Sequence, residues 1–223
     1  MKRLSALIGL IGVLSPVIIF AQTNISSPTM IMSWQASSYI PSGYPGKILP
    51  PRDSVVDVYL EFTDAGVVVP LNTHIIRWSV AGSFFAGGAG LNHIQFPLNR
   101  FTTKSYPITA VIKDYKGADI EKTVIINRAD PFVTLRVIAS EKVAGGTQVS
   151  FRASPFFFSS LNPNDYMFNW TVNRVRVSSR AETLTALLQG EETGQRASVK
   201  VTTTNLNNEI ESADAERQFI INN

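Results

Sequence analysis

The stretch Ile75–Gly82 reads IIRWSVAG, and the rest of the chain is interpreted outward from it. Its apolar side chains, Ile76, Trp78 and Val80, alternate with polar ones. Strict alternation is typical of a β-strand with one buried face and one face in water. The stretch therefore predicts a strand that carries its tryptophan into a core.

The same alternation returns around a second tryptophan, Trp170, which lies 92 positions after Trp78. Its apolar neighbours at every second position are Phe168 and Val172. The alternating segments before and after each tryptophan follow in a similar order, and no segment has the 3.6-residue period of a long amphipathic helix. We therefore interpret the chain as one all-β unit used twice.

The remaining apolar alternation predicts further short strands, at 30–36, 56–62, 94–98, 106–112, 124–126, 133–139, 149–153, 184–188 and 199–203. Proline- and glycine-rich residues 37–51 predict a segment that crosses one end of the first unit. Residues 83–90 predict a loop or a short edge strand, 154–165 a loop, and 205–214 a polar turn.

The N-terminus has the order of a secretory signal peptide. Lys2 and Arg3 precede an apolar run, residues 4–20, and Ala21 comes before the expected cut. The alternative is a retained membrane anchor, for which this run is near the lower length limit. The predicted organisation is a signal peptide at 1–21, a flexible lead at 22–29, and domains at 30–127 and 128–223.

Composition excludes several classes of function. The formal net charge of +3 includes Lys2 and Arg3 of the predicted signal peptide, so the exported chain is close to neutral and has no electrostatic footprint for nucleic acid. The chain contains no cysteine, which excludes disulfides, a thiol nucleophile and a cysteine-ligated metal. Each unit must therefore be stable through packing alone.

The sequence contains no recognised catalytic or metal-binding pattern, so we expect no enzyme, no cofactor and no metal site. The two histidines, His74 and His93, lie in no recognised catalytic or zinc motif, so we expect structural roles. Asp114, Asp119 and Glu121 surround a predicted hairpin turn and would offer oxygen ligands for calcium, but their spacing is not that of a calcium loop.

The tryptophan segments resemble bacterial immunoglobulin-like and PKD-like surface modules. Trp78–Gly82 reads Trp-x-Val-x-Gly, and Trp170–Arg174 repeats it with arginine at the end. The resemblance covers roughly residues 28–223, although the disulfide of antibody domains and the glycine-aspartate turn of PKD domains are missing. It implies two tandem immunoglobulin-like (PKD-like) β-sandwiches used as exported adhesion, scaffold or spacer modules.

The row Phe156, Phe157 and Phe158 is the candidate contact with a partner. A strand sends at most alternate side chains into one core, so three consecutive rings either leave regular structure or reach another surface. The alternatives are a plug against the neighbouring unit and an exposed partner site. Phe84 and Phe85 are a second candidate of the same kind.

The sequence thus predicts a non-catalytic interaction protein, secreted or in the cell envelope, with a protein partner there and a membrane contact only if the N-terminal segment is retained. One alternative function is carbohydrate binding through Tyr39, Tyr44 or Tyr115. The other is an accessory subunit of an envelope or pilus assembly.

Overall fold

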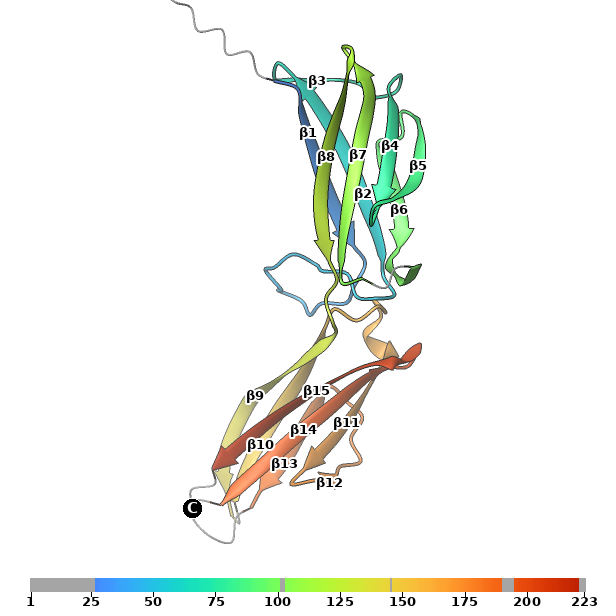
Figure 1. Cartoon of the computed structure of the whole chain (residues 1–223). Helices are drawn as coiled ribbons and strands as arrows, with labels where there is room; N and C mark the ends of the chain where they lie inside the picture. Colours follow the sequence, from blue (N-terminus) through green and yellow to red (C-terminus); the bar gives the residue numbers. More distant parts are fainter. Residues whose placement is uncertain (1–26, 101–102, 145, 190–194, 221–223) are drawn as a thin grey trace, which may run out of the picture.

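The computed structural model describes residues 27–100, 103–144, 146–189 and 195–220, and Figure 1 shows them as two β-sandwiches joined end to end. The predicted signal peptide lies outside the described residues. No helix within the described ranges has the length and apolar character needed to cross a bilayer.

The first module consists of strands β1 to β8 in two antiparallel sheets. In one sheet β2 pairs with β1, β3 and β6, and the other has the order β5-β4-β7-β8. The strands are β1 (Thr29–Ala36), β2 (Val55–Asp64), β3 (Val67–Val68), β4 (Ile75–Val80), β5 (Ser83–Ala89), β6 (His93–Pro97), β7 (Ser105–Tyr115) and β8 (Ala118–Asn127), with a short 3₁₀ helix, η1 (Leu98–Arg100), after β6.

The second module repeats this plan with strands β9 to β15. One sheet has the order β13-β10-β9 and the other the order β12-β11-β14-β15. The strands are β9 (Phe132–Val143), β10 (Gly146–Phe156), β11 (Tyr166–Val172), β12 (Val175–Arg176), β13 (Thr183–Leu188), β14 (Arg196–Asn205) and β15 (Asn208–Ile220), with the 3₁₀ helix η2 (Pro163–Asp165) before β11.

Both modules therefore follow one strand order, in which β1, β2, β4, β5, β6, β7 and β8 correspond to β9, β10, β11, β12, β13, β14 and β15. Such a pair of packed antiparallel sheets with a buried tryptophan is an immunoglobulin-like sandwich. The predicted all-β fold class, with two immunoglobulin-like sandwiches, is confirmed.

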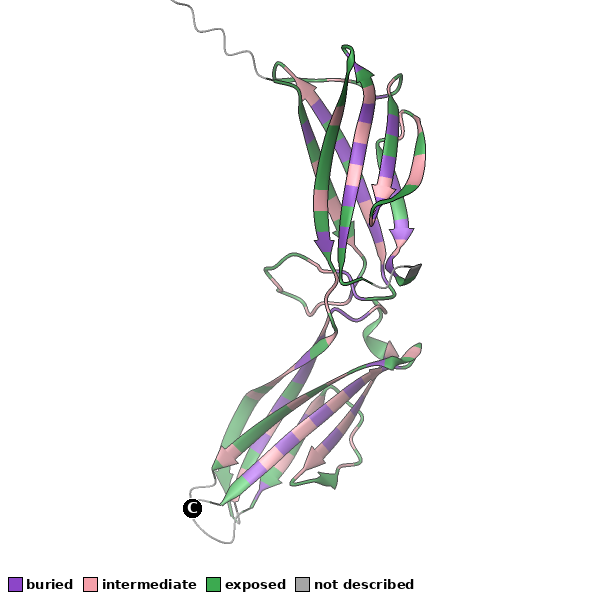
Figure 2. Cartoon of the chain, in the orientation of Figure 1, coloured by how far each residue is buried: buried purple, intermediate pink, exposed green. Residues whose placement is uncertain are grey.

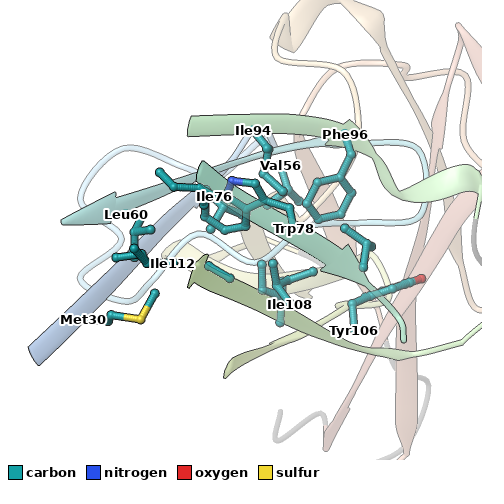
Figure 3. Close-up of a cluster of buried hydrophobic side chains, with 14 of the residues drawn as sticks. Met30, Val56, Leu60, Ile76, Trp78, Ile94, Phe96, Tyr106, Ile108 and Ile112 are labelled. Atoms are coloured by element: carbon teal, nitrogen blue, oxygen red, sulfur yellow. The ribbon is translucent and has the colours of Figure 1, made fainter. Parts of the chain in front are cut away.

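Trp78 is the centre of the first core, as Figure 3 shows. Its side chain is fully buried among residues of both sheets, including Val56, Leu60, Ile94 and Ile108. The indole Nε1–H donates to the carbonyl oxygen of Leu91 at 2.7 Å, so the one polar atom of the ring has a partner inside the module.

Trp170 occupies the corresponding place in the second core. It is also fully buried, and its Nε1–H donates to the carbonyl oxygen of Ala181 at 2.9 Å. Trp78 pairs with Ala110 of β7, and Trp170 pairs with Val201 of β14. Figure 2 shows buried positions alternating with intermediate or exposed positions along β7 and β14, as the sequence predicts.

Two predicted loops are shorter in the structure, because strand pairing extends into them. Residues 154–156 belong to β10, where Phe156 pairs with Phe132. Of the predicted turn at 205–214, only residues 206 and 207 lie between the paired residues Asn205 and Asn208. Pairing with a neighbour holds these segments in strands even though their own side chains do not alternate.

Candidate functional site

The row of three phenylalanines lies at the end of the second module that faces the first. Phe156 ends β10, and Phe157 adopts a left-handed backbone with φ of 57°. This conformation is costly for a residue other than glycine, by about 1–2 kcal/mol. It breaks the alternation of the strand, so successive rings turn to different neighbours.

The segment between β1 and β2 of the first module reaches across to this row. The backbone N–H of Tyr39 donates to the carbonyl oxygen of Phe158 at 2.8 Å, and the N–H of Phe157 donates to the carbonyl oxygen of Tyr39 at 2.7 Å. Tyr39 and Phe158 thus form an antiparallel β-bridge. Figure 1 shows this segment looping into the space between the sandwiches.

Aromatic rings fill the module junction, which we define as the contact of residues 37–53 with residues 132, 156–166 and 205–211. Tyr39 packs edge-on against Tyr166 with ring centroids 5.0 Å apart, and Tyr44 packs against Phe156 and Phe157, both at 5.8 Å. Phe132 stacks on Phe156 at 4.7 Å. Offset and edge-on ring pairs of this kind stabilise beyond the area they bury.

The predicted partner contact is not supported for Phe157 and Phe158, because the chain covers both rings itself. Phe158 is fully buried in the second core, and Phe157 retains 5% of its exposure. Phe156 is half-buried between Tyr44 and Phe132. The structure thus places the row as a plug between the two modules.

A buried carboxylate fixes the loop that follows the phenylalanine row. The Glu211 carboxylate of β15 accepts hydrogen bonds from the Ser159 backbone N–H at 2.9 Å and from the Ser159 hydroxyl at 2.8 Å. It also accepts one from the Asn205 side-chain amide at 2.6 Å. Both Glu211 and Asn205 are buried. These bonds satisfy the carboxylate without a cation, so the loop is held against the β14–β15 hairpin.

The hydrogen bonds of Glu211 with Ser159 and Asn205 form what we call the buried clamp. A polar groove of about 570 Å³ opens beside it, between the two modules. Arg52 and Asp53 line it from the first module, and Ser159, Asn207 and Asn208 from the second. The amide of Asn208 donates to the carboxylate of Asp53 at 2.8 Å and spans the groove. The alternating pattern did not identify Glu211, Asp53 or Asn208, because polar residues in turns look alike in sequence whether or not they meet a partner.

The second candidate contact, Phe84 and Phe85, lies on β5 at the edge of a sheet of the first module. The Phe85 ring packs edge-on against Phe96 at 5.7 Å and is half-buried. Phe84 is 63% exposed, and the Arg77 guanidinium lies 5.4 Å from its ring centroid. Phe84 is therefore open to solvent, unlike Phe157 and Phe158.

The three tyrosines of the carbohydrate-binding alternative have partners within the chain. Tyr39 and Tyr44 belong to the module junction, and burial together with the Glu182 charge raises the pKa of Tyr39. Tyr115 is buried and donates its hydroxyl to the Asp64 carboxylate at 2.8 Å. Tyr39 and Tyr44 are half-buried and Tyr115 is buried, so none of the three is a fully exposed ring.

Tyr59 is instead the tyrosine that faces outward, on β2. It is 39% exposed and stacks on His93 of β6 with ring centroids 4.4 Å apart. His93 Nε2 lies 2.9 Å from the Asp57 carboxylate, which also accepts from the Gln95 amide at 3.1 Å. Two rings and several hydrogen-bonding groups thus share one outer face of the sheet.

The other predicted polar candidates also have local roles. His74 lies against the Tyr115 ring at 5.5 Å. Asp119 pairs with Lys113 and accepts from the backbone N–H of Asp114, and the Lys113 hydrogen bond, followed by the Asp114 bond, lowers the pKa of Asp119. Within the described ranges, no three histidine, aspartate or glutamate residues lie close enough together to hold a metal ion.

The sequence matches no protein-family model and no curated protein. Among solved structures, it is similar to the fibronectin(III)-like modules of Clostridium thermocellum CbhA, with 13% identity and a TM-score of 0.29, over 84% of this chain and 94% of that chain. It is also similar to a glycosyl hydrolase family 2 member from Bacteroides cellulosilyticus, with 11% identity and a TM-score of 0.26, over 87% of this chain and 29% of that one. Both TM-scores are low, so the fold of this chain follows from its own strand order and pairing.

Proposed function

We propose that this chain is an exported, non-catalytic interaction protein whose two immunoglobulin-like modules are held in one fixed arrangement. The observation that carries the proposal is the module junction. A flexible spacer needs only a linker, whereas here the segment at 37–53 of the first module packs on the second. Such packing limits the angles between the modules and presents both outer surfaces in a constant relation.

Two further contacts support a fixed angle. The linker is residues 128–131, between β8 and β9, and the N–H of Ala129 in it donates to the carbonyl oxygen of Pro50 at 2.9 Å, which connects the linker to the segment between β1 and β2. Asp53 and Asn208 are joined across the groove. The modules are therefore connected at the linker, at the aromatic plug and at this polar contact.

Export and a place in the cell envelope are part of the proposal and rest on the N-terminal sequence, Lys2 and Arg3 followed by the apolar run. The PKD-like assignment rests on the Trp-x-Val-x-Gly resemblance, and an accessory subunit of an envelope or pilus assembly is an alternative role for the same exported chain. Co-purification of the tagged chain with an envelope complex is the measurement that supports the subunit assignment.

The test of the fixed arrangement is the variant Tyr39→Ala, measured by small-angle X-ray scattering and by NMR residual dipolar couplings of each module. Loss of the Tyr39 ring removes its packing on Tyr166, so we expect a broader distribution of inter-module angles while both modules stay folded. The matched control is Tyr59→Ala, which removes a tyrosine outside the junction. The proposal fails if the parent chain already shows free rotation, or if Tyr39→Ala leaves the angle distribution unchanged.

A second candidate function, carbohydrate binding, is favoured by the outer face around Tyr59. An exposed ring beside carboxylate and amide groups is the usual chemistry of a saccharide contact, because the ring covers apolar C–H groups and the polar groups bond hydroxyls. Glycan-array binding that Tyr59→Ala abolishes would support it. Binding that is absent in the parent, or unchanged in the variant, would refute it.

A further inference from the structure

Strand β5 leaves one side of its backbone unpaired. It is the last strand of the sheet β5-β4-β7-β8, and its only pairing within the described residues is with β4. Figure 1 shows it at the outer side of the first module. The N–H and C=O groups on its free side form a template for another strand.

We propose that this free edge binds the same strand of a second copy of the chain, so that two first modules join edge to edge in one continuous antiparallel sheet. The inference goes beyond the proposed function, because a fixed junction does not require self-association. It rests on the composition of the edge, on Gly88 and on the exposed apolar side chains beside it.

The composition of β5 lacks the usual protection of an edge strand. Natural edges are blocked by lysine, proline, inward charges, bulges or short length. The seven residues of β5 read SFFAGGA and contain neither a charge nor a proline. The irregular register opposite Trp78 and Ser79 is confined to the start of the strand, and residues 86–89 pair regularly with β4.

Gly88 has no explanation within the module itself. A Cβ atom built at this position meets nothing within 4 Å, and its backbone is not in the left-handed region. Glycine inside a strand costs stability, and it often marks a place where another backbone approaches closely. At Gly87 a Cβ atom would be in ordinary van der Waals contact with the Ile76 carbonyl oxygen at 3.4 Å and with the Phe84 ring at 3.5 Å.

A second copy is the occupant that fits this edge. An uncharged strand offers no electrostatic complementarity to a charged partner, and it pairs with itself without opposing like charges. A two-fold axis lets one surface serve both chains. Phe84 and Ile75 are 63% and 56% exposed on the outer face beside the edge, so the two copies supply apolar surface to the same contact.

The experiment is sedimentation equilibrium of the purified exported chain from about 1 μM to about 1 mM, the range expected for a small interface. We expect the average mass to rise with concentration toward two chains. Gly88→Lys adds an inward-facing charge to the edge where the structure has open space, and should leave a monomer at every concentration. Ala89→Lys, at an exposed position of the same strand, should do the same.

The matched control is Val175→Lys on β12, the corresponding strand of the second module, which should leave the dimer intact. Urea unfolding of each variant verifies that the first module remains folded. The proposal is overturned if the parent chain is monomeric over the whole range. It is equally overturned if the dimer persists in folded Gly88→Lys and Ala89→Lys, because the contact then lies elsewhere.

Discussion

The two modules share a strand order but differ at the strand that follows each tryptophan strand. In the first module this strand, β5, has seven residues and no charge. In the second module it is β12, only two residues long, which includes Arg176 and directly follows Arg174. The second module thus has the short, charged edge that prevents strand addition, and the first does not. The two modules thus share a strand order but differ in how this edge strand is protected.

A second difference concerns the contact between the end of the second strand of each module and its last hairpin. In the first module, Asp64 at the end of β2 pairs with Lys116 at 2.5 Å and with the Tyr115 hydroxyl. In the second, Glu211 of β15 holds Ser159. Asp64 is the last residue of β2, which ends at the side of the first module away from the junction (Figure 1), whereas Glu211 is buried and bonds Ser159 in the junction. The contact between the second strand and the last hairpin is therefore a surface ion pair in the first module and a buried set of hydrogen bonds to Glu211 in the second.

The largest expected effect tests whether the two cores are equivalent. Trp78→Ala and Trp170→Ala should each cost about 3–5 kcal/mol of unfolding free energy in their own module, because each removes a fully buried ring. Urea unfolding with separate probes for each module is the measurement. Trp34→Ala, at a half-buried position, is the control and should cost less. A much smaller loss for one of the two buried tryptophans would break the equivalence.

Next in size is the buried clamp of the second module. Glu211→Ala leaves the Ser159 N–H and the Asn205 amide without their acceptor, so we expect a loss of about 1–3 kcal/mol. Thermal unfolding followed by circular dichroism measures it. Glu209→Ala, at an exposed position on the same strand, is the control and should change little. Equal effects of the two substitutions would show that the clamp contributes nothing specific.

The hairpin turns that follow the two tryptophan strands differ in sequence. In each turn, two residues with left-handed backbone lie between the last paired residues of the hairpin. They are Ala81 and Gly82 in the first module, and Asn173 and Arg174 in the second. Asparagine followed by glycine is the preferred pair in such turns. We therefore expect Ala81→Asn and Arg174→Gly each to raise the free energy of unfolding of their own module by about 0.5–1 kcal/mol. For Arg174→Gly, this figure already subtracts the greater conformational freedom of glycine in the unfolded chain.

Thermal unfolding measures both turn variants. The control is Gly82→Ala, which places a Cβ on a residue with φ of 80° and should destabilise the first module. If Gly82→Ala were neutral, backbone strain would not govern these turns, and the expected gain at Arg174 would also be absent.

The smallest expected effect is the pH dependence of the Asp64 contact. The hydrogen bond from Lys116, followed by that from Tyr115, lowers the pKa of Asp64. A carboxylate with a lowered pKa in the folded state stabilises the protein above its unfolded pKa of about 4, and this contribution is lost as the pH falls through the folded pKa. Asp64→Asn should therefore show a shallower fall in Tm below about pH 4 than the parent. Parallel Tm curves for the two proteins would contradict the contribution.

The sequence alone determined the sandwich plan, because alternation is a local property of strands. Ile76, Trp78 and Val80, and their counterparts around Trp170, predicted which face of each strand is buried, and the burial of both indoles agrees. The glycine and proline positions also separated most strands. What alternation cannot show is which polar turn residues meet each other, since Asp53 and Asn208 are 155 positions apart.

Only the tertiary structure decided the fate of the three phenylalanines and the ends of the shortened loops. The sequence allowed Phe156, Phe157 and Phe158 to be a plug or an exposed site, because three adjacent rings cannot share one face of a strand. Phe158 joins the core of its own module, whereas Phe156 and Phe157 pack against Tyr44, which comes from the other module. Pairing energy between distant segments, which no local pattern records, also extends β10 and β15 into stretches that look like loops in the sequence.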